Sequence, residues 1–165
     1  MKKTIAVVGA TGSQGGGLCQ ALLAMPDAFE VRALTRNPES EKAKLLSAAG
    51  AHVVQADLDD LASLTVAFEG TDGVFGVTNY WEHQSLEREK AQAQNIALAC
   101  QNSVVEHVVW STLEDTRTFI PSDFDAMPML DEVYRVPHLD GKSEADIFFK
   151  DLPTTYLITS FFGTT

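Results

Sequence analysis

A strand, a glycine-rich turn and a helix follow one another in residues 4–23, and this order constrains the fold more than any other feature. Residues 4–8 are β-branched or small and apolar, a run long enough for a buried strand and too short for a helix. Gly9, Gly12 and Gly15 then recur at every third position before apolar residues return at helical spacing. In this context the glycines predict a dinucleotide-binding turn, whereas the glycines alone are equally typical of a turn without a ligand.

Each glycine has a separate physical role in such a turn. Gly9 lets the chain leave the strand tightly, Gly12 lets the backbone approach a pyrophosphate, and Gly15 lets the helix pack close to the strand. The free N–H groups and the positive dipole end of the helix then face the phosphates. We therefore predict that a dinucleotide cofactor binds at this turn.

The chain has 165 residues, 45% of them hydrophobic, which indicates one domain over residues 1–165 with a core of its own. The first three residues lead directly into the predicted strand, where a signal peptide would need a cleavable apolar segment, and no apolar run has the length of a membrane span. The 12 basic and 23 acidic residues give a net charge of −11, which disfavours nucleic acid and anionic membranes as partners. We expect a cytoplasmic protein, present also in the nucleus if it acts as a regulator.

The two cysteines, Cys19 and Cys100, lie in separate helical patterns and lack the spacing of metal ligands. We interpret them as buried thiols of a reducing compartment, with redox sensing as the alternative. The sequence predicts no metal site.

Apolar runs and helical patterns alternate along the chain. The runs predict strands at residues 4–8, 29–34, 51–55, 74–77, 104–110 and 154–159. The patterns predict helices after the glycine turn and at residues 39–49, 59–68, 85–101 and 142–150, with a loop at 78–84 and a mobile loop over the site at 113–137. Such alternation is typical of a parallel sheet. We predict an α/β fold, a Rossmann-type doubly wound parallel sheet of six strands in order 3-2-1-4-5-6 with helices on both faces.

The end of the second predicted strand discriminates between NAD and NADP. An NAD site usually has a carboxylate there for the ribose 2′-hydroxyl, but no carboxylate lies between Glu30 and Glu39. Arg36 occupies this region, and a guanidinium can bind a 2′-phosphate through paired hydrogen bonds. We predict NADP(H), with a solvated surface arginine as the alternative; the helix phase leaves open whether Lys42 or Lys44 adds positive charge.

Polar and aromatic residues also follow the third and fourth predicted strands. Asp57 is placed to reach an adenine amino group or to cap the next helix, and both roles are compatible. Thr78 and Asn79 lie at the carboxyl edge, where ligands bind in open α/β sheets. Tyr80 and Trp81 either form the wall of a pocket or pack on the edge of the sheet.

Six segments carry a resemblance to a known family: GATGSQGG, TRNP, VVQADLDD, VTNYWEH, VVWSTLED and PHLDGK. Together, over residues 3–163, they resemble the NmrA-like family, an atypical branch of the short-chain dehydrogenase/reductase superfamily. The resemblance implies a Rossmann fold that prefers NADP(H). The family includes fungal nitrogen-metabolite regulators and animal NADPH-sensing proteins, and related reductases act on plant phenylpropanoids or quinones.

The resemblance also implies which residues contact the cofactor. The pyrophosphate is expected to contact the glycine turn at Gly9, Thr11, Gly12, Ser13, Gln14 and Gly15, and the 2′-phosphate to contact Arg36. The adenine is expected at Asp57 and Leu58, and the central part of the cofactor at Thr78 and Asn79. The nicotinamide ribose is expected at Lys142, and the nicotinamide side at Ser160, Phe161 and Phe162.

The catalytic prediction depends on the Tyr-x-x-x-Lys motif of ordinary short-chain dehydrogenases, in which lysine lowers the pKa of tyrosine. Lys142 matches the lysine, but His138 stands four residues earlier, on the same helical face, and a histidine is able to act as a general acid. The alternatives are a solvated first-turn lysine and a helix-entry histidine without a role. Ser111 matches the active-site serine of the superfamily, although serine is also common at strand ends for turn reasons.

Three hypotheses for the function follow from these residues. The first is an NADP(H)-binding redox sensor or regulator that signals to a protein partner through residues 113–137, favoured by Arg36, the missing tyrosine and the acidic surface. The alternative is an NADPH-dependent reductase of a quinone, carbonyl or benzylic ether, and a third reading is an interaction scaffold without nucleotide. Because family members continue past the sixth strand with elements of the substrate pocket, we expect this chain to be truncated, with those elements absent.

Overall fold

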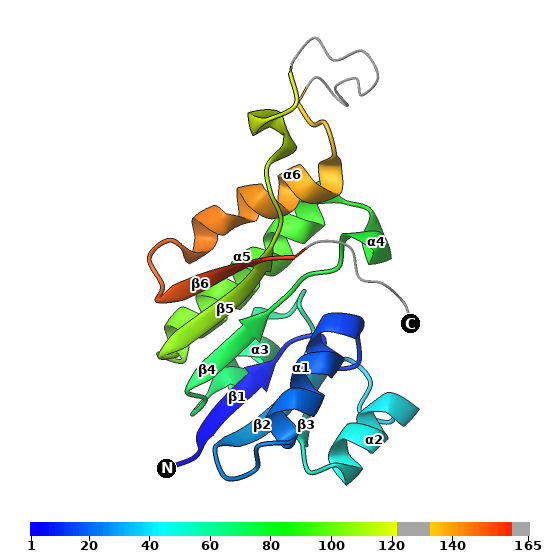
Figure 1. Cartoon of the computed structure of the whole chain (residues 1–165), viewed down its shortest axis with the longest axis vertical. Helices are drawn as coiled ribbons and strands as arrows, with labels where there is room; N and C mark the ends of the chain where they lie inside the picture. The colour runs from blue at the N-terminus through cyan, green and yellow to red at the C-terminus, as the bar shows by residue number, and fades with distance from the viewer. Residues whose placement is uncertain (122–132, 160–165) are drawn as a thin grey trace.

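The computed structural model describes residues 1–121 and 133–159, and it contains one sheet of six parallel strands (Figure 1). The strand order is β3-β2-β1-β4-β5-β6, which confirms the predicted topology. The strands are β1 (Lys3–Val7), β2 (Phe29–Thr35), β3 (His52–Gln55), β4 (Gly73–Gly76), β5 (His107–Thr112) and β6 (Thr154–Ile158).

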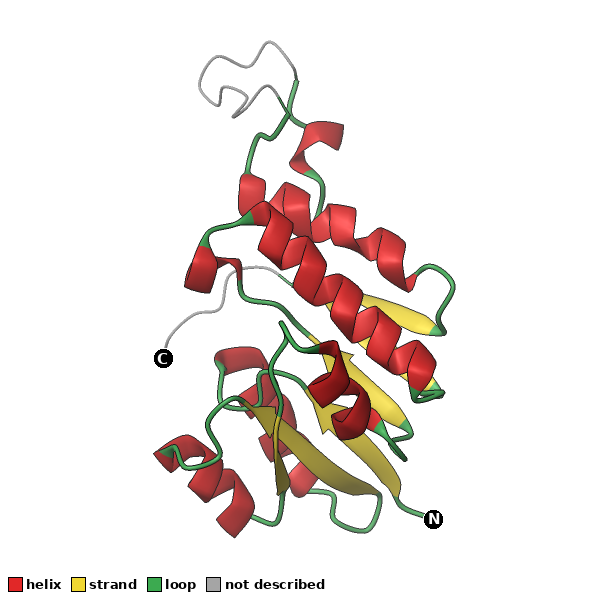
Figure 2. Ribbon diagram, turned by 180° about the vertical axis from the view of Figure 1, so that it is seen from behind, coloured by secondary structure: helices red, strands yellow, loops and turns green. Residues whose placement is uncertain are grey.

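Helices cover both faces of the sheet, as Figures 1 and 2 show from opposite sides. One face carries α1 and α2, and the other carries α3, α5 and α6. The helices are α1 (Ser13–Leu23), α2 (Glu41–Ala48), α3 (Leu61–Phe68), α4 (Tyr80–His83), α5 (Leu86–Asn102) and α6 (Pro137–Glu144), with 3-10 turns η1 (Thr116–Thr118) and η2 (Ala145–Phe149).

The hydrophobic core is divided by the sheet into two parts. Under α3 and α5, Trp110 stacks on Phe149 with ring centroids 4.4 Å apart, and Ile96 and Cys100 point inward as the helical pattern predicts. Under α1, the smaller part contains Cys19. The tight contact of both helix layers fixes the carboxyl edge of the sheet, where the strand-following loops meet.

Three predicted element boundaries are wrong. The predicted loop at 78–84 contains the short helix α4. The fifth strand begins at His107 because Val104 has a left-handed φ of 52° and forms a turn. Helix α6 begins at Pro137 rather than Lys142, since proline has a φ suited to the first helical turn, and it passes into η2 at Ala145.

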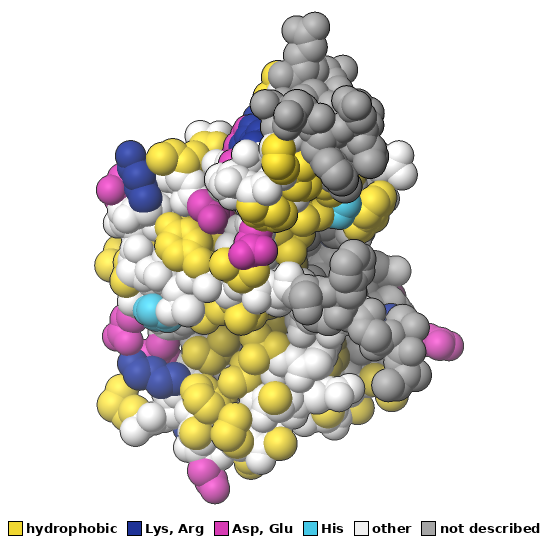
Figure 3. Space-filling view, turned by 45° about the horizontal axis from the view of Figure 1, so that its top comes forward, with side chains coloured by type: hydrophobic (Ala, Val, Ile, Leu, Met, Phe, Trp, Pro, Cys, Tyr) yellow, Lys and Arg dark blue, Asp and Glu magenta, His cyan; other side chains and the backbone are white. Residues whose placement is uncertain are grey.

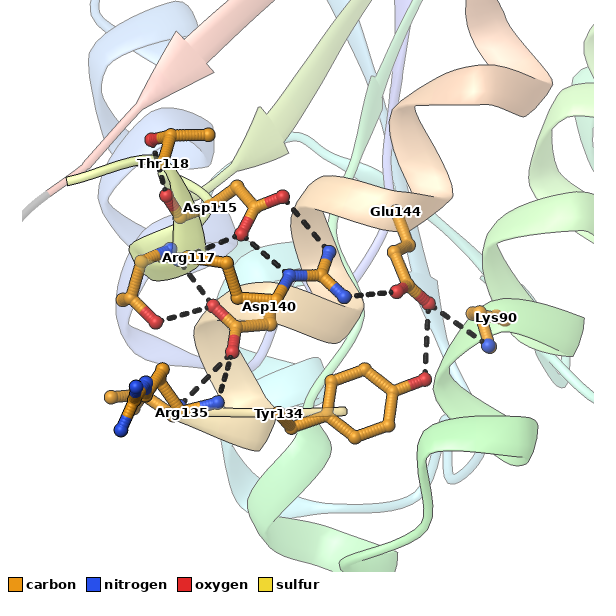
Figure 4. A network of polar contacts seen from close by, with 10 residues as sticks. Lys90, Asp115, Arg117, Thr118, Tyr134, Arg135, Asp140 and Glu144 are labelled. Atoms are coloured by element: carbon orange, nitrogen blue, oxygen red, sulfur yellow. Dashed lines mark hydrogen bonds and ion pairs between the residues drawn. The ribbon is translucent and has the colours of Figure 1, made fainter. Parts of the chain in front are cut away.

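The described ends of the predicted mobile loop are fastened to α6, and residues 122–132 lie outside the described ranges (Figure 4). The fully buried carboxylate of Asp140 accepts hydrogen bonds from the N–H and hydroxyl groups of Thr116, at 2.8 and 2.6 Å. It also accepts from the N–H groups of Arg135 and Val136, at 2.8 and 3.0 Å. These four bonds hold both flanks of the segment against the start of α6.

A second polar group supports the same helix from the side of α5 (Figure 4). The guanidinium of Arg117 binds Asp115 at 2.8 Å and Glu144 at 2.7 Å. The other oxygen of Glu144 accepts from Lys90 at 3.0 Å and from the Tyr134 hydroxyl at 3.2 Å. Helix α6 is therefore fixed along its length, which determines the positions of the side chains that it carries toward the sheet.

Among the described residues, one part of the sheet surface is not covered by a helix. Beside α1, an apolar cavity of about 570 Å³ lies over β4, β5 and β6, and Figure 3 shows it as a hydrophobic hollow bordered by charged side chains. Its lining includes Leu18, Phe75, Val109 and Leu157. Within the described ranges, no helix combines the length and the apolar character needed to cross a membrane.

Candidate functional site

The order of the strands reverses between β1 and β4, and this point determines where a ligand fits. In open α/β sheets, ligands bind beyond the carboxyl ends of the strands at such a switch point. Here the N–H of Val8 bonds to the carbonyl of Phe75 at 3.0 Å, which joins the ends of the two strands. The glycine turn follows β1 and Thr78 follows β4, so both predicted parts of the site meet at this edge.

The glycine turn has the geometry that the sequence predicts. Gly9 has a left-handed φ of 64°, and its carbonyl accepts a hydrogen bond from Gly12 at 2.8 Å. A Cβ on Gly15 would lie 2.4 Å from the oxygen of Gly9, so α1 can approach β1 only because this residue is glycine. Gly12 is the N-cap of α1 and has no side chain to occupy the helix end. The backbone therefore leaves a cradle at the N-terminus of an eleven-residue helix, which fits a pyrophosphate.

Two side-chain contacts support this turn. The hydroxyl of Ser111, at the end of β5, donates to the Oε1 atom of Gln14 at 2.7 Å and so holds the first turn of α1. Lys42 Nζ donates to the carbonyl of Thr11 at 3.3 Å, which resolves the helix phase that the sequence left open. Lys44 instead pairs with Glu39. Of these two lysines, only Lys42 adds positive charge beside the turn.

Arg36 lies just after β2, as predicted, and forms an ion pair with Glu82 of α4. Both side chains are about half exposed, so the pair is exchangeable and contributes little stability. Because β1 lies between β2 and β4 in the sheet, this ion pair spans the edge above the glycine turn. The sequence analysis did not identify Glu82.

Asp57 and Leu58 lie beyond β3, and the helix-capping alternative for Asp57 is wrong. Asp60 is the N-cap of α3, and its carboxylate accepts from the N–H groups of the first helical turn. Asp57 instead accepts from the N–H of Asp59 at 3.0 Å in a local turn. The carbonyl of Leu58 accepts from Asn95 at 2.8 Å, which ties this loop to α5. Contact of Asp57 and Leu58 with adenine remains a prediction.

Lys142 is buried, so the alternative of a solvated first-turn lysine is wrong. Its side chain is 9% exposed, and Nζ donates to the carbonyl of Thr78 at 2.8 Å. Nζ also lies 3.5 Å from Oε1 of Glu89, which accepts a bond of 2.6 Å from the hydroxyl of Thr78. Burial lowers the pKa of Lys142, and the carboxylate of Glu89 acts against that shift. The amine is thereby held at the carboxyl end of β4.

His83 joins this group on the other side of Glu89. Its Nδ1 accepts a hydrogen bond from the N–H of Ser85 at 3.1 Å, so we assign the ring proton to Nε2. That atom lies 3.5 Å from Oε2 of Glu89. Both atoms are buried, and neither has a hydrogen-bond partner within the described ranges. Sequence reasoning missed both His83 and Glu89.

His138 lies on α6 one turn before Lys142 and packs against aromatic side chains of α4. Its ring centroid is 4.7 Å from that of Trp81 and 6.1 Å from that of Tyr80. Burial lowers the pKa of His138, which favours the neutral imidazole, and the carboxylate of Asp140 acts against that shift. His138 lies near the start of α6, as the helix-entry alternative requires, and whether it has a catalytic role stays a prediction. Tyr80 and Trp81 pack against His138 of α6.

The remaining predicted residues have fewer observed contacts. Asn79 is the N-cap residue of α4, and its carbonyl accepts from the N–H of Glu82 at 3.2 Å. Ser160, Phe161 and Phe162 lie outside the described residues. In the part of the chain that the structure describes, no group of three or more acidic, histidine or cysteine side chains is placed to hold a metal ion.

A profile of the NmrA-like family matches residues 1–165. The chain belongs to the NmrA-like family. The NmrA-like family domain-containing oxidoreductase notA′ of Aspergillus versicolor is 38% identical over 123 residues, which are 72% of this chain and 34% of that protein. An NmrA-like family domain-containing protein of Dictyostelium discoideum is 32% identical over 154 residues, which are 92% of this chain and 46% of that protein. The chain thus spans a third to a half of the length of these relatives.

Two solved structures are similar to this chain over more than nine-tenths of its length. The negative transcriptional regulator NmrA in complex with NAD has a TM-score of 0.77 and 25% identity, and it covers 94% of this chain and 44% of its own. The NADPH-dependent quinone oxidoreductase QOR2 of Escherichia coli, complexed with NADPH, has a TM-score of 0.67 and 25% identity. That match covers 93% of this NmrA-like chain and 46% of the oxidoreductase.

Proposed function

We propose that this NmrA-like chain binds NADP(H) along the carboxyl edge of its sheet. The observation that carries the proposal is the turn between β1 and α1, where Gly9 is left-handed and Gly15 has no space for a Cβ, at the point where the strand order reverses. NmrA and the Escherichia coli quinone oxidoreductase, each crystallised with a dinucleotide, support the proposal.

The chain's own residues suggest how the cofactor lies. Backbone N–H groups of Ser13 and Gln14, in the first turn of α1, would hold the pyrophosphate beside the charge that Lys42 adds. Arg36 would exchange Glu82 for the 2′-phosphate, and the absence of a carboxylate at the end of β2 favours the phosphorylated cofactor over NAD(H). Lys142 would contact the nicotinamide ribose from α6.

We propose that the full protein is an oxidoreductase acting on a quinone, carbonyl or benzylic ether. NADPH supplies a hydride when it is bound, and the chain must place the ribose and provide a proton. An ammonium has three N–H donors, and Lys142 directs at most two of them to Thr78 and Glu89. The third remains for a ribose hydroxyl or for a proton-transfer step, and the oxidoreductase names of the fungal relatives are consistent with this role.

A sensor without turnover is the second candidate, and one observation favours it. At the position of the catalytic tyrosine the chain has His138, which packs against Trp81 and has a pKa lowered by burial. A neutral, packed imidazole is a weaker proton donor than an imidazolium. The similarity to NmrA, named a negative transcriptional regulator, is consistent with a regulatory protein that signals to a partner.

Calorimetric titration of the 165-residue chain with NADPH, NADP⁺ and NADH tests the cofactor proposal. We expect NADPH and NADP⁺ to bind at least tenfold more tightly than NADH, and we expect Arg36→Glu to abolish this preference. Lack of binding by all three dinucleotides would contradict the proposal. Unchanged preference in Arg36→Glu would contradict only the assignment of the 2′-phosphate.

The choice between oxidoreductase and sensor is tested on a chain extended to the length of the relatives, because those proteins are more than twice as long as this chain. NADPH oxidation measured across quinones and enones, and lost in Lys142→Ala, is the expected result for an oxidoreductase. Tight NADPH binding without turnover of any substrate, combined with a large affinity difference between NADPH and NADP⁺, would instead support the sensor.

A further inference from the structure

Glu89 is the most unusual residue near the site. Glutamate is almost never fully buried unless it is paired, yet Glu89 is 0% exposed in the core-facing stripe of α5. The buried residues of α5 after it are apolar, among them Ala93, Ile96 and Cys100, except for Gln92, whose side chain donates to Asp59. Burying a carboxylate there is unfavourable unless the charge is compensated. The groups that compensate this charge therefore indicate the role of Glu89.

Each oxygen of Glu89 faces a different partner. Oε1 accepts from the hydroxyl of Thr78 at 2.6 Å and lies 3.5 Å from Nζ of Lys142. Oε2 lies 3.5 Å from Nε2 of His83, whose ring is fixed by the bond from Ser85 to Nδ1. Groups from the segment after β4, from α4 and from α6 therefore converge on one carboxylate of α5.

The carboxylate also provides the charge that Lys142 needs in its buried position. Burial disfavours an ammonium, whereas a negative charge nearby favours it. The groups that act on Lys142 are Glu89 of α5, Asp146 of η2, His138 on its own helix and, through Glu89, His83 of α4. Among the described residues, only Glu89 forms an ion pair with Lys142.

We propose that Glu89 is a positioning residue for the cofactor site. It holds the ammonium of Lys142 charged and directed along the carboxyl end of β4, ready to donate to the nicotinamide ribose. The hydroxyl of Thr78 orients the carboxylate through its hydrogen bond, and His83 lies beside the other oxygen. The segment after β4 therefore helps to position Lys142, through Glu89 and through the carbonyl of Thr78. The inference rests on the proposed function, because it gives Lys142 a cofactor to bind.

A ligand pair separates this role from a general contribution to folding. NADPH contains the nicotinamide ribose, whereas 2′,5′-ADP contains only the adenosine end with its phosphates. Substitution of a residue that acts through Lys142 should weaken the binding of NADPH and leave the binding of 2′,5′-ADP unchanged. A residue that only stabilises the fold affects both ligands equally or affects neither.

The test is calorimetric titration of Glu89→Gln with NADPH and with 2′,5′-ADP. Glutamine keeps the shape and an acceptor for Thr78 but removes the charge. We expect NADPH to bind about tenfold more weakly and 2′,5′-ADP to bind within twofold of the unmodified chain. Glu87→Gln is the matched control, because Glu87 lies on the same helix two residues earlier and is exposed, and it should change neither affinity.

Three outcomes overturn the inference. Equal NADPH affinity in Glu89→Gln and the unmodified chain would show that the carboxylate does not act on the site. An equal loss of both ligands would assign Glu89 to the fold. If the unmodified chain binds neither ligand, the proposed function fails, and the inference fails with it.

A double variant keeps the inference testable if Glu89→Gln alone does not fold. Lys142→Met with Glu89→Gln removes both buried charges together, which is often tolerated where a single removal is not. We expect this double variant to bind NADPH as weakly as Lys142→Met alone, because Glu89 acts through Lys142. A further loss in the double variant would mean that Glu89 has an independent effect and would contradict the proposal.

Discussion

The two ends of the candidate site are built by different means. At the glycine end, the backbone determines the geometry: Gly9 is left-handed, and the oxygen of Gly9 occupies the place where Gly15 would have a Cβ. At the lysine end, buried charges determine it: Lys142 and Glu89 come from different helices and meet at β4. The first arrangement depends on the absence of atoms, and the second depends on the presence of compensating charges.

This difference implies that the two ends respond to opposite kinds of mutation. Adding one methyl group at Gly15 disrupts the glycine end, because the backbone of this turn is held by close contact rather than by a buried charge. Removing one charge disrupts the lysine end, because the remaining partner is left buried and uncompensated. Substitutions matched in size and in helix position can therefore break one end at a time.

The largest effect is expected from Gly15→Ala. The new Cβ would lie 2.4 Å from a backbone oxygen that cannot rotate away, so α1 must move off β1. We expect a loss of about 3 kcal/mol in the free energy of unfolding, at the upper end for overpacking, together with loss of NADPH binding. Urea unfolding and calorimetry measure the two effects.

Gly17→Ala is the control for this change. It lies in the same helix, and a Cβ there would meet no atom within 4 Å. Because alanine is the better helix former, we expect Gly17→Ala to gain about 0.5–1 kcal/mol. Equal destabilisation by both substitutions would show that the close contact between Gly15 and Gly9 does not determine the geometry of this end.

The sequence predicted the glycine end well because its determinants are local. The spacing of Gly9, Gly12 and Gly15 within strand and helix patterns is sufficient to identify the turn, and the strand order follows from the alternation. Arg36 was found for the same reason, since it directly follows a predicted strand.

The lysine end was predicted only in part, because its determinants are distant in the sequence. Lys142 was identified through the family resemblance, but its partners Thr78 and Glu89 come from the segment after β4 and from α5. One signal for Glu89 was present: it precedes Ala93, Ile96 and Cys100 at helical spacing, which places a carboxylate on the buried stripe. His83 had no comparable signal, since the helix α4 that carries it was itself predicted to be a loop.

Each half of the core contains one buried cysteine, and alkaline unfolding compares the two halves. Burial raises the pKa of Cys19 on α1 from 9.0 to about 11 and that of Cys100 on α5 to about 12. Above pH 9 the thiols ionise in the unfolded chain but stay protonated in the folded one. The unfolded state then binds fewer protons, so stability falls with rising pH, by about 1.4 kcal/mol per pH unit for each thiol.

Cys19→Ala and Cys100→Ala, unfolded by urea between pH 8 and pH 10.5, test this prediction. In each variant the free energy of unfolding should fall less steeply with pH, because one thiol no longer contributes. The stability lost through poorer packing should be the same at every pH. The lowered pKa of Lys142 gives a slope of opposite sign, but it is common to all the chains and cancels in the comparison. An unchanged slope in Cys100→Ala would mean that the lysine-side core admits water at this helix.

The smallest effect on stability, and the one that links the two ends, is expected from Glu82→Gln. Glu82 pairs with Arg36 at the glycine end, while the next residue, His83, faces Glu89 at the lysine end. Because the Arg36 pair is half exposed, its loss should cost no more than about 0.5 kcal/mol. The freed guanidinium should bind NADPH about two- to fivefold more tightly, while the affinity for NADH stays constant, and the gain should shrink at high salt.

Glu39→Gln, which removes an exposed partner of Lys44, is the matched control and should change neither affinity. Equal changes for NADPH and NADH would mean that Glu82 acts through α4 and His83 on the lysine end, and that the two ends are coupled rather than separate.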